Sequence, residues 1–126
     1  RVLFRSPLRG STASIWSALE ARGATHHHRR PLPGDLAFFD DTYDRNGNGR
    51  PDDLLTHVAV VLEVTPDGTL TMAHDGTTRG RSTLRMNLLE PDDSTLNDPL
   101  RARRSKDPPG LRTLASHLWH GFAHPR

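Results

Sequence analysis

The feature that most constrains the fold is a nearly continuous apolar segment, residues 56–64, which is rich in β-branched side chains. A segment of this length and composition is typical of a β-strand that is buried on both faces. Pro66, Asp67 and Gly68 follow, and these residue types favour a tight turn. Residues 69–74 then form a second β-rich segment. The sequence therefore predicts an antiparallel hairpin whose first strand is buried.

Two further strands are predicted around this hairpin. A Pro-Gly-Asp turn at residues 33–35 leads into residues 36–39, which are apolar and aromatic. Residues 83–88 alternate between apolar and polar side chains, which is the pattern of a strand with one buried face. The residues expected to point inward are Leu84, Met86 and Leu88.

Helical spacing of apolar residues predicts a helix over residues 11–22, with Ser11 or Thr12 as the N-cap and Gly23 as its end. Its apolar face, led by Trp16, is expected to pack on the sheet. A second helix is expected over residues 111–119, and a long, partly disordered surface loop over residues 90–110. The 126 residues suffice for one α+β domain.

Composition limits the possible partners. The net charge is only +2, and the arginines are scattered among acids without interleaved aromatic residues, which argues against nucleic acid. No apolar run reaches the roughly 18 residues of a membrane span, which argues against a membrane-inserted protein. A mildly basic surface suits an anionic polymer such as a bacterial cell wall. We expect a monomer.

Residues 40–53 form the most polar part of the chain, rich in acids and amides. The residues at positions one, three, five and nine of a calcium-loop pattern are Asp44, Asn46, Asn48 and Asp52. Gly49 permits the sharp turn that such a loop needs. Leu55 stands where an EF-hand has its bidentate glutamate, so Asp41 or Asp53 would have to supply a carboxylate. The alternative is a turn whose side chains bond their own backbone.

Two histidines are candidates for catalysis. His57 begins the buried strand, and His74 ends the strand that pairs with it. In a hairpin that turns at Asp67 and Gly68, paired residue numbers sum to about 135, so both rings are expected at one end of the sheet. A histidine held by a second polar group has the geometry of a general base and its orienting partner. The alternative is two ordinary sheet-edge histidines.

Residues 26–28 are three consecutive histidines. They are interpreted as a solvated linker, because consecutive side chains do not converge on one face of a helix or strand.

Residues 33–39 read Pro-Gly-Asp-Leu-Ala-Phe-Phe, residues 56–61 read Thr-His-Val-Ala-Val-Val, and residues 72–74 read Met-Ala-His. This order resembles the second half of NlpC-type and CHAP-type papain-like cysteine peptidases and amidases. The resemblance implies a papain-like antiparallel sheet with flanking helices. It also implies that His57 is the general base, that His74 orients it, and that Asp35 is a structural turn acid.

The same resemblance implies hydrolysis of amide bonds, with peptidoglycan or a peptide as substrate and no required cofactor beyond the possible Ca²⁺. The intact protein would act outside the cell or in the cell envelope. The family nucleophile is a cysteine at the start of an upstream helix, and this sequence contains no cysteine. Ser11 and Ser14 lie at a helix start, but a histidine activates a thiol far more readily than a hydroxyl.

The sequence therefore predicts an N-terminally truncated domain over residues 7–126 that is inactive alone. Residues 1–6 are expected to derive from a sequencing adapter or to be disordered. Two alternatives stay open. One is a catalytically dead domain of the same fold that binds cell wall, and the other is a small calcium-stabilised β module with incidental histidines.

Overall fold

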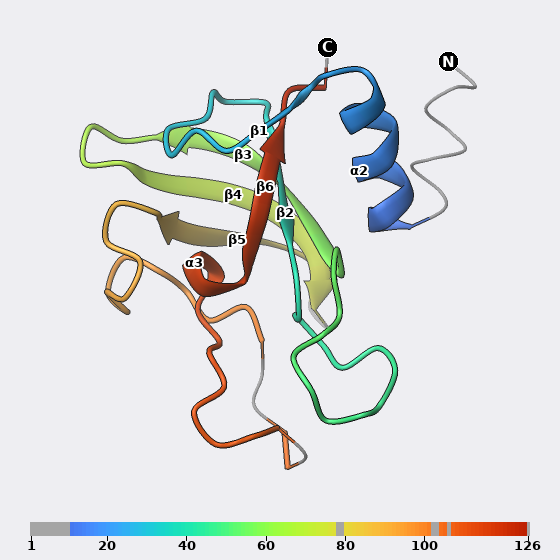
Figure 1. Ribbon diagram of the computed structural model, residues 1–126. Helices are drawn as coiled ribbons and strands as arrows, with labels where there is room; N and C mark the ends of the chain where they lie inside the picture. The colour runs from blue at the N-terminus through green and yellow to red at the C-terminus, as the bar shows by residue number, and fades with distance from the viewer. Residues whose placement is uncertain (1–10, 78–79, 102–103, 106, 126) are drawn as a thin grey trace.

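Figure 1 shows the computed structural model, which describes residues 11–77, 80–101, 104–105 and 107–125. Within these residues the centre of the molecule is an antiparallel six-stranded sheet with the order β1-β6-β2-β3-β4-β5. The strands are β1 (Thr25–His26), β2 (Leu36–Phe39), β3 (His57–Val64), β4 (Thr69–Thr77), β5 (Gly80–Asn87) and β6 (Trp119–Ala123). The helices described are α2 (Thr12–Ala21) and α3 (Ala115–Leu118). This small sheet with few helices is compatible with the predicted α+β class.

Helix α2 begins and ends where the sequence predicted. The hydroxyl of Ser11 accepts a hydrogen bond from the Ser14 amide, as an N-cap does. Gly23 has a φ of 70°, and the amides of Gly23 and Ala24 bond back to Glu20 and Leu19. This is the Schellman pattern, in which glycine adopts the left-handed conformation at low cost. Helix α2 is thus capped at both ends by its own sequence.

The buried face of α2 docks on one face of the sheet. Trp16 is 6% exposed and meets Phe38 of β2 edge to face, with ring centroids 5.0 Å apart. Leu19 and Ala123 complete this smaller core. A larger core on the sheet contains the residues Phe39, Met72, Met86, Leu118 and Phe122. The prediction that Trp16 faces the sheet is confirmed.

The β3–β4 hairpin is confirmed, and its register lies close to the predicted one. Val60 pairs with Ala73 and Val64 with Leu70, with an irregularity between Val61 and Glu63. The predicted burial of β3 on both faces is wrong. Val61 is 1% exposed, whereas Val60 and Leu62 on the alternate face are 39% and 51% exposed, because no described element covers them.

Strand β5 is confirmed, and Leu84, Met86 and Leu88 are buried as predicted. The predicted helix over residues 111–119 is wrong at both ends. Leu114 is extended and bridges Pro99, and Trp119 begins β6, so only four residues are helical. Strand β6 runs between β1 and β2, where its aromatic residues enter the core.

The interpretation of residues 26–28 as a solvated linker is wrong for His26, whereas His28 lies outside the strand and is exposed. Thr25 and His26 pair with Ala123 and Phe122 of β6, and the rings of His26 and Phe122 lie 5.5 Å apart. Long-range pairing with a late strand overrides the local signal, which is too short to mark a strand. Thr25 and His26 therefore form an edge strand of the sheet.

The predicted loop over residues 90–110 holds no long element among its described residues, but it is not only a surface loop. Asn97 is fully buried and its side-chain oxygen accepts the Asn87 amide at 2.7 Å. The disorder expected there falls partly on residues 102, 103 and 106, which lie outside the described residues, as do residues 1–6. In the described part of the chain, no helix has the length and apolarity to cross a membrane.

Candidate active site

The two predicted histidines lie together at one end of the β3–β4 hairpin. His57 pairs with Phe39 at the start of β3, and His74 lies on the neighbouring strand β4. The Nε2 atom of His57 and the Nδ1 atom of His74 are 2.8 Å apart, with the rings nearly perpendicular at 85°. The hairpin therefore brings together the side chains that the sequence predicted to share one end of the sheet.

A third side chain, which the sequence reasoning missed, extends this pair. Ser82 of β5 lies directly opposite His74, and its Oγ atom is 3.1 Å from His74 Nε2. The predicted strand began at Thr83, one residue too late to include it. The alternation of Leu84 and Met86 would have placed Ser82 on the same inward face.

The environment keeps both histidines neutral near pH 7. Burial and, to a lesser extent, repulsion from His74 lower the pKa of His57 to about 4, although Asp75 partly opposes both effects. Burial also lowers the pKa of His74, and Asp75 again opposes the shift. A neutral imidazole has one nitrogen free to accept a proton. Among the described residues, Nδ1 of His57 has no hydrogen-bond partner.

A cavity of about 580 Å³ has both histidines in its lining. Most of the other lining residues, which come from α2, β2, β3 and β4, are apolar, and Thr12 and Asp75 are the polar ones: Thr12, Ile15, Leu36, Val58, Ala59, Val60, Leu62, Ala73 and Asp75. The exposed side chains of Val60 and Leu62 belong to this surface. The site thus combines a polar histidine pair with an open apolar wall.

A known protein family matches the part of the chain that carries both histidines. The family model of the CHAP domain matches residues 3–76, which is more than half of the chain. The chain belongs to the CHAP domain family. The match includes β2, β3 and most of β4, and therefore both His57 and His74. No curated protein and no solved structure matches the chain.

A CHAP domain indicates a function of the peptidoglycan-hydrolase type, and peptidoglycan is the polymer on which CHAP domains act. The sequence of this CHAP domain contains no cysteine. The hydroxyl of Ser11 is engaged as the N-cap of α2 and lies 3.1 Å from that of Ser14. In the described part of the chain neither hydroxyl bonds to a histidine. These serines are therefore committed to the helix start.

Asp35 holds together three separate segments of this CHAP domain. Its carboxylate lies 2.9 Å from Nε2 of His26 and 2.6 Å from Nδ1 of His124, and it also accepts the Leu32 amide. Burial alone would raise the pKa of Asp35, but the hydrogen bonds from His124, His26 and Leu32 outweigh it and hold the pKa below its usual value. The implied role as a turn acid fits these contacts.

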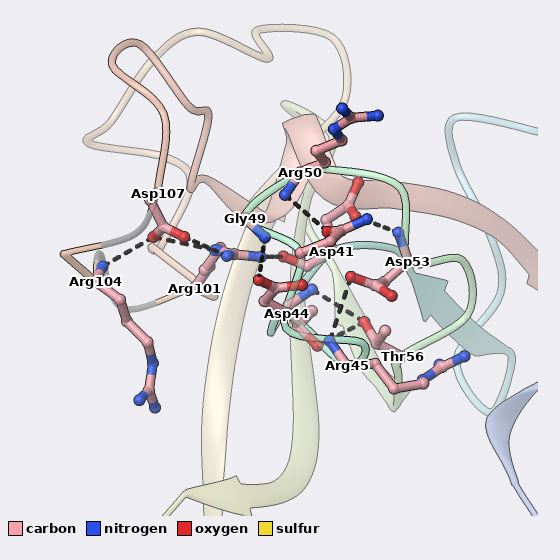
Figure 2. A network of polar contacts seen from close by, with 12 residues as sticks. Asp41, Asp44, Arg45, Gly49, Arg50, Asp53, Thr56, Arg101, Arg104 and Asp107 are labelled. Carbon is pink, nitrogen blue, oxygen red and sulfur yellow. Dashed lines mark hydrogen bonds and ion pairs between the residues drawn. The ribbon is translucent and has the colours of Figure 1, made fainter.

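The loop between β2 and β3 contains the predicted calcium ligands. Figure 2 shows Asp44 accepting the Gly49 amide through Oδ2 at 2.7 Å. The side-chain oxygens of Asn46 and Asn48 accept hydrogen bonds from the backbone amides of Asn48 and Arg50, respectively. The side-chain NH₂ groups of Asn46 and Asn48 both donate to the carboxylate of Asp52. These contacts are the backbone-bonded turn considered above as the alternative. Oδ1 of Asp44 is buried without a hydrogen-bond partner.

Side chains of three or more histidine, cysteine, aspartate or glutamate residues do not gather into a metal-binding group anywhere in residues 11–77, 80–101, 104–105 and 107–125. Asp53, one of the two possible extra carboxylates, bonds to the Arg45 amide through its side chain. The other, Asp41, accepts the Asp53 amide at 2.8 Å. Both therefore close the loop onto itself.

A buried arginine fixes this loop to the C-terminal half of the CHAP domain. The guanidinium of Arg101 donates to the Asp41 carbonyl at 2.8 Å and pairs with the carboxylate of Asp107 (Figure 2). Arg101 is 4% exposed. On the other side, Thr42 bonds to Thr56, the residue before His57. The residue before β3 is thus bonded to the same loop that Arg101 anchors.

Proposed function

We propose that this chain supplies the histidine half of a papain-like cysteine amidase or peptidase that hydrolyses amide bonds of peptidoglycan. The hydrogen bond of 2.8 Å between His57 Nε2 and His74 Nδ1 is the observation that supports it. His57 is the general base and His74 the residue that orients its ring. The open wall beside them, with Val60 and Leu62 exposed, offers surface for the rest of the site.

The chemistry follows from the neutral state of His57. Its free nitrogen, Nδ1, takes the proton of a thiol, and the thiolate attacks an amide carbonyl carbon. The resulting imidazolium returns the proton to the leaving amine, and the C–N bond breaks to give an acyl-enzyme. Water then attacks the acyl carbon while Nδ1 takes its proton, the C–S bond breaks to release the carboxylic acid, and the proton on Nδ1 returns to the thiolate. A neighbouring thiolate favours the imidazolium, so the pKa of His57 rises from about 4 when a nucleophile is present.

We further propose that the nucleophile is a cysteine in a part of the protein outside this sequence. The support is that the 126 residues contain no cysteine and that Ser11 and Ser14 are engaged at the start of α2. The chain alone is then expected to release no product from peptidoglycan.

The test is to recover the coding sequence that precedes the codon for Pro7, express it with this domain, and assay peptidoglycan hydrolysis. His57→Ala should abolish turnover with the fold intact, and His74→Ala should leave residual activity. His28→Ala, which changes an exposed histidine, should have wild-type activity. Wild-type activity in His57→Ala would refute the assignment.

The same material tests the alternative of a domain that binds cell wall without cleaving it. An upstream sequence without cysteine, combined with sedimentation of this chain with insoluble peptidoglycan, would favour the binding function.

From the sequence alone we also propose that residues 44–52 take up Ca²⁺. A monomeric state is likewise a proposal, and so is a location outside the cell or in the cell envelope, which rests on the family resemblance.

A further inference from the structure

The hydrogen bonds around His74 continue to a third residue, Ser82, whose role no family resemblance assigns. We propose that Ser82 is a positioning residue that fixes the proton of His74 on Nε2 and thereby leaves Nδ1 of His57 free to accept a proton. The catalytic meaning of this arrangement rests on the proposed function, but the arrangement itself is a property of the chain as it stands.

The contacts hold the His74 ring from two sides. Nδ1 of His74 lies 2.8 Å from His57, and Nε2 lies 3.1 Å from the Ser82 hydroxyl. His74 is 9% exposed, and Ser82 faces it directly across the β4–β5 ladder. A flip of the ring would break both hydrogen bonds of a side chain that is itself largely buried, and that carries a substantial cost. The orientation of His74 is therefore fixed.

Two proton arrangements satisfy these contacts when both rings are neutral. In the first, His57 Nε2–H donates to His74 Nδ1, and His74 Nε2–H donates to the Ser82 oxygen. In the second, the Ser82 hydroxyl donates to His74 Nε2, His74 Nδ1–H donates to His57 Nε2, and the remaining proton of His57 is on Nδ1. The choice at Ser82 therefore determines which nitrogen of His57 carries a proton.

Only the first arrangement suits a general base at Nδ1 of His57. There Nδ1 has a free lone pair, and after it takes a proton the bond from His57 Nε2–H to His74 stays as it was. In the second arrangement Nδ1 is already protonated, so every proton along the chain would have to shift first. The proposed role therefore requires the Ser82 oxygen to accept from His74 Nε2–H, since a donating Ser82 hydroxyl would stabilise the second arrangement instead.

The experiment uses this chain labelled with ¹⁵N in its histidines, and long-range ¹H–¹⁵N correlation spectra that distinguish protonated from bare ring nitrogens. At pH 7 we expect both His57 and His74 to carry their proton on Nε2. Ser82→Thr keeps the hydroxyl and should preserve this pattern. Ser82→Val has nearly the same shape as Ser82→Thr but lacks the hydroxyl. Its His74 signals should move to intermediate positions as the proton distributes over both nitrogens of the ring.

Thr83→Val is the matched control, because Thr83 is the next residue on β5 and is exposed. It should leave both histidines unchanged. If Ser82→Val does not fold, Ser82→Ala takes its place, and the spectrum of the unchanged chain still decides between the two arrangements.

Two results would overturn separate statements. Identical histidine spectra in the unchanged chain and in Ser82→Val would refute the role of Ser82 and leave the proposed function intact. A proton on Nδ1 of His57 in the unchanged chain would contradict both the arrangement and the use of Nδ1 as the base. Peptidoglycan assays of the cysteine-containing protein test the proposed function independently of either spectrum.

Discussion

The carboxylate of Asp35 lies 2.6 Å from Nδ1 of His124, which joins the turn before β2 to the residue after β6. Asp35 is 1% exposed, so its carboxylate lies away from solvent, while the His124 side chain is partly exposed. Hydrogen bonds to a charged group typically contribute about 1.5–3 kcal/mol. The Asp35 cluster should therefore be one of the main polar contributions to stability.

Replacing Asp35 by asparagine should lower the free energy of unfolding by about 1.5–3 kcal/mol, measured by urea denaturation, since the charge that holds both histidines is lost. Asp92→Asn is the matched control. It removes an aspartate–histidine contact whose carboxylate side chain is 85% exposed, and the expected loss is below about 1 kcal/mol. Because the pKa of Asp35 is lowered in the folded state, its contribution is present above pH about 3.8 and is lost as the pH falls below that value. Equal losses in the two variants would contradict the role of burial.

His57 should titrate far below the ordinary histidine range, with a pKa of about 4 in NMR spectra of the chain. The unfolded chain binds a proton at His57 near pH 6.5, whereas the folded chain does not until about pH 4. The contribution of neutral His57 to the free energy of unfolding is therefore fully present above pH 6.5, and it is lost as the pH decreases toward 4. His57→Gln should flatten this part of the pH–stability curve, and an unchanged slope would show that His57 is not the group responsible.

Breaking the ion pair of Arg101 with Asp107 should destabilise the domain strongly. Their side chains are 3% and 2% exposed, and removal of one partner of a buried pair typically costs about 3–5 kcal/mol. Arg101→Met should therefore lower the urea midpoint clearly, while Arg85→Met should lower it little, because the pair of Arg85 with Asp98 is largely exposed. The double replacement Arg101→Met and Asp107→Leu should recover much of the loss. A double variant as unstable as Arg101→Met would argue against this explanation.

Ca²⁺ should raise the thermal midpoint if the loop over residues 44–52 binds it, by an amount equivalent to about 2.7 kcal/mol at a hundredfold excess over Kd. Asp44→Asn should abolish the shift, because Asp44 contributes the first carboxylate of the pattern. Asp93→Asn, which changes a partly exposed aspartate of another turn, should retain it. A midpoint that does not respond to millimolar Ca²⁺ would leave the self-bonded turn as the complete description of this loop.

The elements that the sequence predicted well have strong local signals. Ser11 and Gly23 mark the ends of α2, and alternation or a continuous apolar run marks β3, β4 and β5. The histidine pair could be anticipated because one tight turn determines which residues of a hairpin lie opposite each other. These features depend on residues that are close together along the chain.

The features that the sequence did not predict depend on distant pairing. Strand β1 has only two residues and exists because β6 binds beside it, and the partners of Asp35 lie on both sides of it in sequence. The exposure of Val60 and Leu62 depends on which elements cover that face of the sheet, and the composition of the chain does not indicate those elements. Local propensity is a weak guide wherever tertiary contacts decide.

The position of β6 has a consequence for synthesis on the ribosome. Strands β2 to β5 follow one another along the chain and pair with their neighbours, so they can associate as soon as they emerge. Strand β1 must wait for β6, which is made after the other described strands and inserts between β1 and β2. Until then the free edge of β2 is open to other strands, including those of another nascent chain. Residues 119–123 thus end the period in which the growing domain is most exposed to misassembly.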